Sequence, residues 1–211
     1  KISADKTVIT TSNPRLTGLL QKELNKLDIH LKVGRTCPDL GVDSGSGARR
    51  ATVTSTSRIT KATHHLKKIA TLRGGGVPAE KLIRTGPEKS WAYSPEAYGL
   101  FKTAEAKIRS ATADACGRPG AQSCPVTTIA VTLGTQADPL SICVYKSITW
   151  WVHTWHGFAA KGLLRKAWIN IRSQMCAKMR WETVKGPVST LIMHLDLIGW
   201  QHVWPDRWVD E

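Results

Sequence analysis

The sequence predicts an α+β fold in which a small strand–helix–strand unit is followed by a mostly α-helical, basic body. The first forty-odd residues contain β-type segments on either side of one amphipathic helix. Apolar residues recur at helical spacing through most of the remaining chain. The 30 Lys and Arg outnumber the 16 Asp and Glu, which gives a net charge of +14. With 211 residues and 41% hydrophobic content, the chain is long and apolar enough to build a core.

The N-terminal unit, residues 1–43, begins with an extended segment at 2–9. Asn13-Pro14 then predicts a helix start, because a capping side chain precedes a proline whose missing N–H is not needed there. Four leucines at helical spacing predict one apolar face: Leu16, Leu20, Leu24 and Leu27. Apolar and polar residues alternate over 29–33, which predicts a half-buried strand. A second short strand is expected at 40–42, after a break at Cys37-Pro38.

The rest of the chain divides into three further segments. Residues 44–57 are rich in Gly, Ser and Thr and are predicted to form a linker. Residues 58–134 form a basic helical region, and 135–211 a tryptophan-rich helical region with an extended tail after Gly199. Helices are expected at 58–72, 78–84, 94–115, 146–158, 161–180 and 186–198. Residues 126–133 fit a strand and a buried helix equally well.

The charge excess predicts a polyanionic partner, and nucleic acid is the first candidate because the basic residues recur on helices that also carry apolar stripes. The candidate phosphate contacts are Arg49, Arg50, Lys61, Lys68, Arg165 and Arg172. Eight of the nine tryptophans lie beyond residue 149, and the ninth is Trp91. Most of the eight fall on apolar stripes and are expected in the core. Trp204 and Trp208, in the tail, are the expected exceptions and would be free to stack on bases.

Several other classes are disfavoured by the sequence. No apolar run is long enough to span a bilayer, and the N-terminus does not resemble a signal peptide. The five cysteines are odd in number and irregularly spaced, which argues against a disulfide framework and for a reducing, intracellular compartment. No Cys or His pair has zinc-finger spacing. The glycines at 74–76 lack the Gly-Lys-Ser/Thr of a phosphate-binding loop.

Two short motifs in the N-terminal unit carry a resemblance to a known family. They are Ile2, Lys6 and Thr7 in the first extended segment, and Asp39, Leu40, Gly41 and Val42 near the second strand. Together they resemble the end of the palm of reverse transcriptases of non-LTR retroelements. In that family a Leu-x-Ile/Val-x-x-x-Lys-Thr segment lies shortly after the catalytic aspartates, and a strand ending near Leu-Gly-Val forms the primer grip.

The resemblance implies a role for each part of the chain. Lys6 and Thr7 would lie near the incoming nucleotide, and residues 39–42 would be primer-grip-like. Residues 1–43 would be a palm remnant, and the basic helices from 58 onward the thumb or connection that grips an RNA or RNA–DNA duplex. The expected partners are that duplex and the remaining palm and fingers, in a nuclear setting.

The resemblance does not extend to catalysis in this chain. Such polymerases hold two divalent metal ions on paired carboxylates. This sequence has no adjacent carboxylate pair in a tight turn, since Asp210-Glu211 lies at the end of the chain. We therefore expect no catalytic residue, no metal ligand and no cofactor here; magnesium would belong to the full polymerase.

Two other interpretations stay open. The chain fits a helical nucleic-acid-binding or scaffold protein without polymerase ancestry, and also a decayed element. The geometry of residues 1–43 separates the first of these from the polymerase interpretation. The polymerase interpretation requires strands at 2–9 and 31–42 with the 13–27 helix packed on one face, whereas a wholly helical segment would rule it out.

Overall fold

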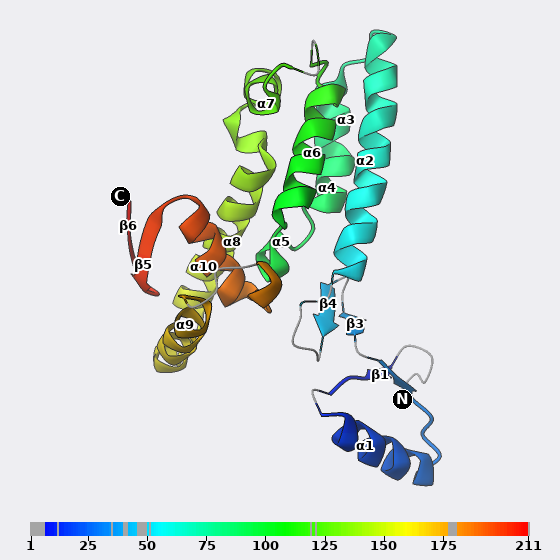
Figure 1. Cartoon of the computed structure of the whole chain (residues 1–211), viewed down its shortest axis with the longest axis vertical. Helices are drawn as coiled ribbons and strands as arrows, with labels where there is room; N and C mark the ends of the chain where they lie inside the picture. Colours follow the sequence, from blue (N-terminus) through cyan, green and yellow to red (C-terminus); the bar gives the residue numbers. More distant parts are fainter. Residues whose placement is uncertain are drawn as a thin grey trace. The chain divides into compact units, whose positions relative to one another are not determined.

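The computed structural model describes residues 7–11, 13–34, 36–39, 42–45, 50, 52–118, 120, 122–176 and 181–210. The described residues confirm an α+β fold with a mostly helical body, and their strands form two-stranded sheets (Figure 1). The chain divides into two compact units, Lys1–Ser55 and Thr56–Glu211. The division falls in the first turn of the long helix α2 (Val53–Gly74).

The first unit contains the predicted strand–helix–strand arrangement. Strand β1 (Val8–Ile9) and strand β2 (Lys32–Val33) pair in parallel, and helix α1 (Pro14–Lys26) connects them. Asn13 caps α1 as predicted, because its side-chain oxygen accepts a hydrogen bond from the Arg15 N–H at 3.0 Å. The described part of residues 1–43 is therefore not wholly helical.

A hairpin follows in the same unit. Strand β3 (Thr36–Asp39) pairs antiparallel with strand β4 (Val42–Gly45), and Asp39 lies opposite Val42. The predicted break at Cys37-Pro38 is wrong, since both residues belong to β3; proline is tolerated on an edge strand, where no partner needs its N–H. The predicted linker 44–57 is also shorter in the structure, because β4 continues to Gly45 and α2 already begins at Val53.

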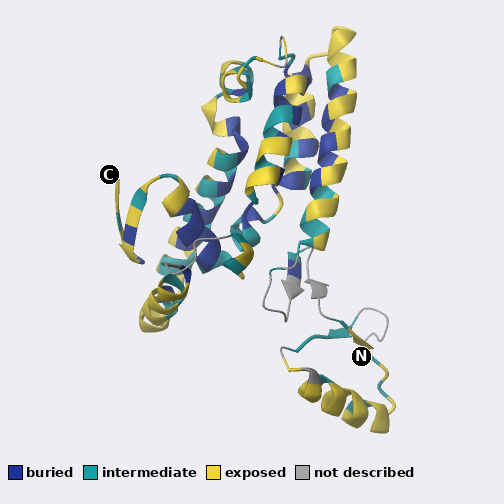
Figure 2. Ribbon diagram, in the orientation of Figure 1, coloured by how far each residue is buried: buried dark blue, intermediate teal, exposed yellow. Residues whose placement is uncertain are grey.

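The apolar face of α1 is not buried as expected. Leu16, Leu19, Leu20 and Leu27 are between 41% and 69% exposed, and Figure 2 shows α1 mainly in the colour of exposed residues. The physical reason is the size of the neighbouring sheet. Strands β1 and β2 have two residues each, which is too little surface to cover a helix of 13 residues.

The second unit is built from helices. After α2 come α3 (Ala79–Thr85), α4 (Pro87–Trp91), α5 (Pro95–Tyr98), α6 (Lys102–Ala115), α7 (Pro125–Leu133), α8 (Pro139–Gly157), α9 (Lys161–Cys176) and α10 (Pro187–Leu197). Two short 3-10 turns lie at Thr135–Ala137 and Trp181–Thr183. The tail, predicted as a single extended segment, folds back as an antiparallel hairpin of β5 (Trp200–Trp204) and β6 (Arg207–Asp210).

Residues at helix starts explain two differences from the sequence prediction. One is the helical state of residues 126–133, which the apolar pattern left open, and the other is the start of α8, which it placed too late. Residues 126–133 are helical, within α7, which has Pro125 in its first turn. Helix α8 begins at Pro139 rather than at 146, because the Asp138 side chain accepts a hydrogen bond from the Leu140 N–H at 2.9 Å. The helix expected at 161–180 is described as far as Cys176.

The single helix predicted at 94–115 is divided into α5 and α6 by Gly99. Its φ of +60° lies in the left-handed region, where a side chain is strained. A Cβ atom added there would lie 2.5 Å from the Trp181 ring and 3.1 Å from Nε2 of His194. The close approach of this ring to the backbone therefore requires glycine and ends α5 after one turn.

Three apolar clusters fill the helical unit. Leu66 and Ile69 of α2 pack with residues of α3, α6 and α7, including Ile83 and Ile129. A second cluster joins the start of α2 to α4 and α6, with Ile108 at its centre. The third contains the tryptophans of α8 and α9 together with α10, whose inner residues are fully buried (Figure 2).

Candidate nucleic-acid interface

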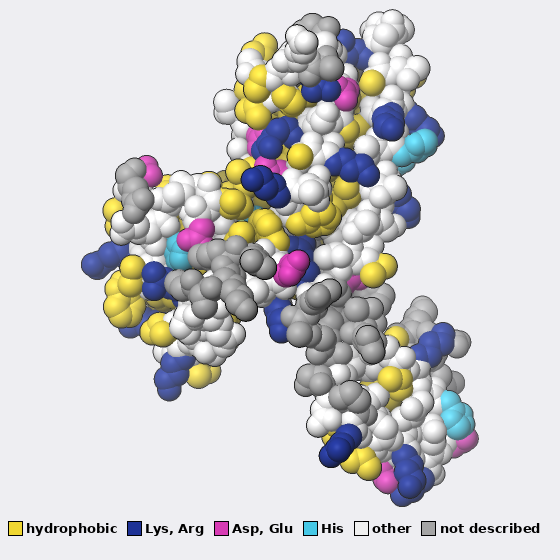
Figure 3. Space-filling model, viewed as in Figure 1, with side chains coloured by type: hydrophobic (Ala, Val, Ile, Leu, Met, Phe, Trp, Pro, Cys, Tyr) yellow, Lys and Arg dark blue, Asp and Glu magenta, His cyan; other side chains and the backbone are white. Residues whose placement is uncertain are grey.

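Helix α2 presents a basic face without acidic residues. Its 22 residues include five Lys or Arg and no Asp or Glu: Arg58, Lys61, Lys67, Lys68 and Arg73. Ile59, Ala62, Leu66 and Ile69 are buried along one side of the helix. The polar residues therefore lie on the opposite side, where Figure 3 shows Lys, Arg and His side chains along the edge formed by α2.

Lys61 and Lys68 share this exposed side with His65 between them. The two lysines are two helical turns apart, about 10 Å along the axis. That spacing corresponds to about three base pairs of a duplex. Among the residues that the structure describes, neither lysine forms an ion pair, so both charges are available to an external anion.

The cations at the two ends of the face are held by the protein itself. The Arg58 guanidinium lies 4.1 Å from the centre of the Tyr93 ring, a cation–π contact. The Arg73 guanidinium covers Gly117, whose φ of +83° and lack of a side chain leave the room for it. The middle of α2 is therefore the part of the face with free charge. We call Lys61, His65 and Lys68 the α2 basic face.

Helix α9 also carries several basic residues and no acidic ones. Its cations are Lys161, Arg165, Lys166 and Arg172. Arg165 pairs with Asp206 at 3.1 Å and also lies 5.7 Å from the centre of the Trp155 ring. Nε of Arg172 is buried, so this guanidinium is less accessible than the sequence suggested.

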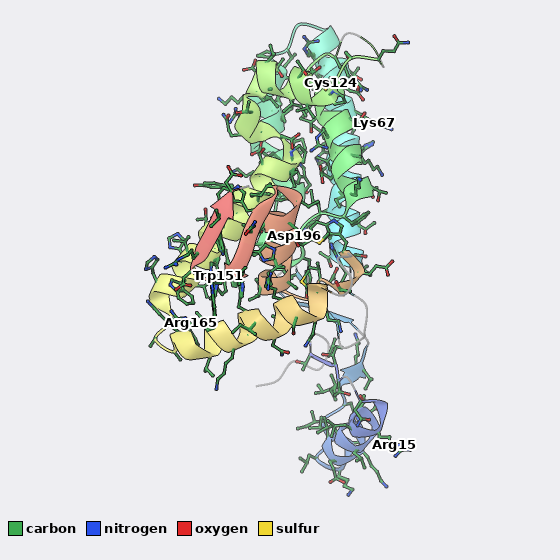
Figure 4. The ribbon with its side chains drawn as sticks, turned by 60° about the vertical axis from the view of Figure 1, so that its left-hand side comes forward. Arg15, Lys67, Cys124, Trp151, Arg165 and Asp196 are labelled. Carbon is green, nitrogen blue, oxygen red and sulfur yellow. The ribbon has the colours of Figure 1, made fainter. Side chains whose placement is uncertain are left out.

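Within the helical unit, the structure does not combine the four predicted phosphate contacts into one surface. Figures 1 and 4 both place α9, which carries Arg165, apart from α2, which carries Lys67. Arg50 belongs to the first unit, is half-buried, and has its Nε and Nη1 atoms buried. Arg49 lies outside the described residues. Among the described candidates, Lys61 and Lys68 share one face of α2, Arg165 and Arg172 share helix α9, and Arg50 lies in the first unit.

The residues of the polymerase resemblance are only partly described. Lys6, Leu40 and Gly41 lie outside the described residues. Thr7 directly precedes β1 and is half-buried. Asp39 ends β3 and Val42 begins β4, so the predicted primer-grip segment spans the connection of a hairpin.

A cavity that the sequence did not predict lies between α8 and the β5–β6 hairpin. It has a volume of about 320 Å³, and its walls include Trp151, Trp155, Trp200 and Trp208, with His156 and Asp206 as polar residues. We call it the tryptophan groove. The sequence indicates the i, i+4 spacing of Trp151 and Trp155 and a turn at Pro205-Asp206. It does not indicate that the hairpin folds back onto α8.

Hydrogen bonds from two buried indoles hold the hairpin against the helices. Trp151 Nε1 donates to the Pro205 carbonyl at 2.7 Å, and Trp168 Nε1 donates to the His202 carbonyl at 3.2 Å. Trp208 stacks on Trp168 with ring centres 6.2 Å apart, so its predicted freedom to stack on a base is wrong. Trp204 is 52% exposed, as predicted.

Two pairs of polar side chains lie inside the helical unit. Ser147 and His194, 2.8 Å apart, are fully buried in the core. Arg109 makes two hydrogen bonds to Asp138, at 2.6 and 2.8 Å. Burial alone would raise the pKa of Asp138, but the hydrogen bond and charge of Arg109 outweigh it and hold this pKa below its ordinary value.

The described residues contain no group of three or more His, Cys, Asp or Glu side chains that could hold a metal ion. Asp43 is buried in the first unit, and both of its carboxylate oxygens accept hydrogen bonds from Thr54 at 2.6 Å. None of the helices in the described part of the chain is both long and apolar enough to span a bilayer.

Comparison of the chain with protein-family models, with curated proteins and with solved structures finds no match.

Proposed function

We propose that this protein binds a nucleic-acid duplex through its phosphate backbone, as the template–primer-binding part of a reverse transcriptase of the non-LTR retroelement type. The observation that carries the proposal is the α2 basic face, where two exposed lysines form no ion pair with any described residue and the helix has no acidic residue. The net charge of +14 supports the same partner. Lys61 and Lys68 would contact phosphates and read no base edges, so binding is independent of sequence.

The first unit agrees with the polymerase interpretation in its order of strands and helix, although the apolar face of α1 is largely exposed rather than packed on the sheet. The β1–α1–β2 arrangement lies between the two motifs that resemble the end of a palm, and the following hairpin contains Asp39 and Val42 of the second motif. The exposed leucines of α1 offer an apolar surface for the remaining palm and fingers. The catalytic carboxylates and their magnesium would come from that remainder, and the isolated chain would not polymerise. We propose an intracellular, nuclear location on the basis of the partner.

The test of duplex binding is a salt series on matched charge variants. We expect Lys61→Gln/Lys68→Gln to weaken binding to a labelled RNA–DNA duplex, measured by fluorescence anisotropy. The slope of log affinity against log salt should fall by about 2, because each neutralised phosphate contributes about 0.9. The control is Lys81→Gln/Lys89→Gln, which removes the same charge from exposed sites next to Glu80 and Glu88.

Two results would overturn the proposal. One is an affinity that stays flat between low and moderate salt for the unchanged protein. The other is an equal loss of affinity in the Lys61/Lys68 and Lys81/Lys89 variants, because net charge alone would then explain binding.

A primer–template with a recessed end separates polymerase ancestry from the alternative of a helical nucleic-acid-binding protein. The polymerase interpretation predicts tighter binding to a recessed RNA–DNA primer–template than to a blunt hybrid of equal length, because the primer-grip-like hairpin would contact the primer end. Equal affinity for the two substrates would favour the alternative.

A further inference from the structure

We propose that the tryptophan groove is a second nucleic-acid site, which takes an unpaired nucleobase of a single strand. It lies between α8 and the β5–β6 hairpin and is separate from the α2 basic face. The proposal goes beyond duplex binding, because it concerns a different surface and a different form of nucleic acid.

The groove offers aromatic surface that is held in place. Trp151 is buried at its base, and the hydrogen bond from its Nε1 to Pro205 fixes both the ring and the turn of the hairpin. Trp155 and Trp200 are half-buried, so each exposes part of its ring, whereas Trp208 is stacked on Trp168 and forms part of the wall. Aromatic side chains of this kind stack with any base, because every base has a π-face.

The charges beside the groove fit a base that carries a phosphate. Lys161 and Arg165 approach the Trp155 ring to 5.6 and 5.7 Å, and both are exposed on a helix without acidic residues. A base stacked at Trp155 would bring its phosphate within reach of these cations. Asp206 already accepts a hydrogen bond from Arg165 at 3.1 Å through Oδ2, and its carboxylate can also accept one from a base, as aspartate does from the amino group of cytosine. Figure 4 shows Trp151 beside the hairpin and Arg165 on the neighbouring helix.

The size of the cavity also favours one base over a larger ligand. Its volume of about 320 Å³ is at the lower end of the range of ligand pockets, about 300–1,000 Å³. A duplex has no free base face to insert, so the groove requires a single strand or a frayed end.

The test uses a labelled decamer of deoxycytidine and an abasic decamer of equal charge, with anisotropy as the readout. Trp155→Ala should weaken binding of the deoxycytidine decamer about 5- to 100-fold, the range for loss of one base-stacking ring. Trp204→Ala is the matched control, because Trp204 is on the same hairpin, is 52% exposed and does not line the groove. The abasic decamer should bind weakly to all three proteins.

A second variant guards against loss of folding in Trp155→Ala. Val152 lines the groove and is 44% exposed, so Val152→Glu places a negative charge there without removing core volume. It should weaken decamer binding, whereas Val152→Gln should have a smaller effect. The Lys61→Gln/Lys68→Gln protein should keep its affinity for the decamer, so failure at one surface is distinguishable from failure at the other.

Three results would overturn the inference. Equal binding of the abasic and deoxycytidine decamers would show that only backbone charge matters. Equal affinity in Trp155→Ala and Trp204→Ala, or no effect of Val152→Glu, would show that the groove is not used. Displacement of the decamer by choline at low concentration would identify the groove as an aromatic cage for quaternary ammonium groups instead.

Discussion

Helices α1 and α10 both carry leucines at helical spacing, yet one is exposed and the other is buried. Leucines at helical spacing mark one side of α1, but Leu16, Leu20 and Leu27 of that side are between 41% and 69% exposed. In α10, Leu191, Ile192 and Leu195 are fully buried. The difference lies in their neighbours, because α10 contacts α5, α8, α9 and β5, whereas α1 connects two strands of two residues each. An amphipathic pattern defines a face, but burial needs a second surface of matching size.

The helical unit contains two further pairs of like residues, one of tryptophans and one of aspartates. In each pair one residue is buried and the other is exposed. Trp168 is fully buried and hydrogen-bonded, whereas Trp204 is half exposed on a neighbouring strand. Asp138 and Asp206 each pair with an arginine, but the side chain of Asp138 is 12% exposed and that of Asp206 is 36% exposed. These pairs of like residues allow burial to be tested with the chemistry held constant.

The largest effect is expected at Trp168. Trp168→Ala should lower the free energy of unfolding by about 3–5 kcal/mol, because it removes a fully buried ring and its hydrogen bond to His202. Trp204→Ala should change it by less than about 1 kcal/mol, since that ring is already largely in water. Urea unfolding followed by far-UV circular dichroism measures both. Similar losses in the two variants would contradict the packing of the hairpin on α9.

An intermediate effect is expected at Asp138. Asp138→Asn should cost about 2 kcal/mol, because it removes the charge that accepts two hydrogen bonds from Arg109 in a mostly buried site. Asp206→Asn should cost less than about 1 kcal/mol, because its pair with Arg165 is exposed. The same unfolding measurement checks both, and a larger loss for Asp206→Asn would reverse the comparison.

The contribution of Asp138 to the free energy of unfolding should also decrease at low pH. The pKa of Asp138 is lower in the folded protein than its ordinary value, so its contribution is complete above that ordinary value of about 4. The contribution is lost as the pH falls through the folded-state pKa. The gap in stability between the unchanged protein and Asp138→Asn should therefore be constant at neutral pH and shrink below about pH 4. A gap that grows on acidification would contradict the assigned direction.

Local chemistry made much of the fold predictable from sequence. Asn13-Pro14 identified the start of α1, and the apolar stripe that contains Leu191 and Leu195 identified α10. Errors arose where a contact between distant residues decides the structure. Gly99 ends α5 because the Trp181 ring occupies the space beside it, and the hairpin β5–β6 depends on hydrogen bonds to α8 and α9. Neither contact has a signature within a short window of sequence.

The candidate sites were predictable to different degrees for the same reason. Lys61 and Lys68 share a face by helical periodicity alone, so their grouping was accessible from the sequence. The grouping of Arg165 with them was not, because it depends on how α9 packs relative to α2. The tryptophan groove escaped prediction because Trp155 and Trp200 come from elements that are brought together only by tertiary contacts.

The smallest change in stability is expected for a substitution in α1. Its effect should be confined to α1 and should not spread to the rest of the protein. Asn13→Ala removes the cap of α1, which is worth about 1 kcal/mol. Because the exposed leucines of α1 provide little tertiary stabilisation, its amides should exchange with solvent faster in this variant, while those of α10 keep their protection. Hydrogen–deuterium exchange with mass spectrometry resolves the two helices. Equal protection of α1 and α10 in the unchanged protein, or loss of protection in α10 on removal of the cap, would mean that α1 is stabilised by contacts as strong as those of the core.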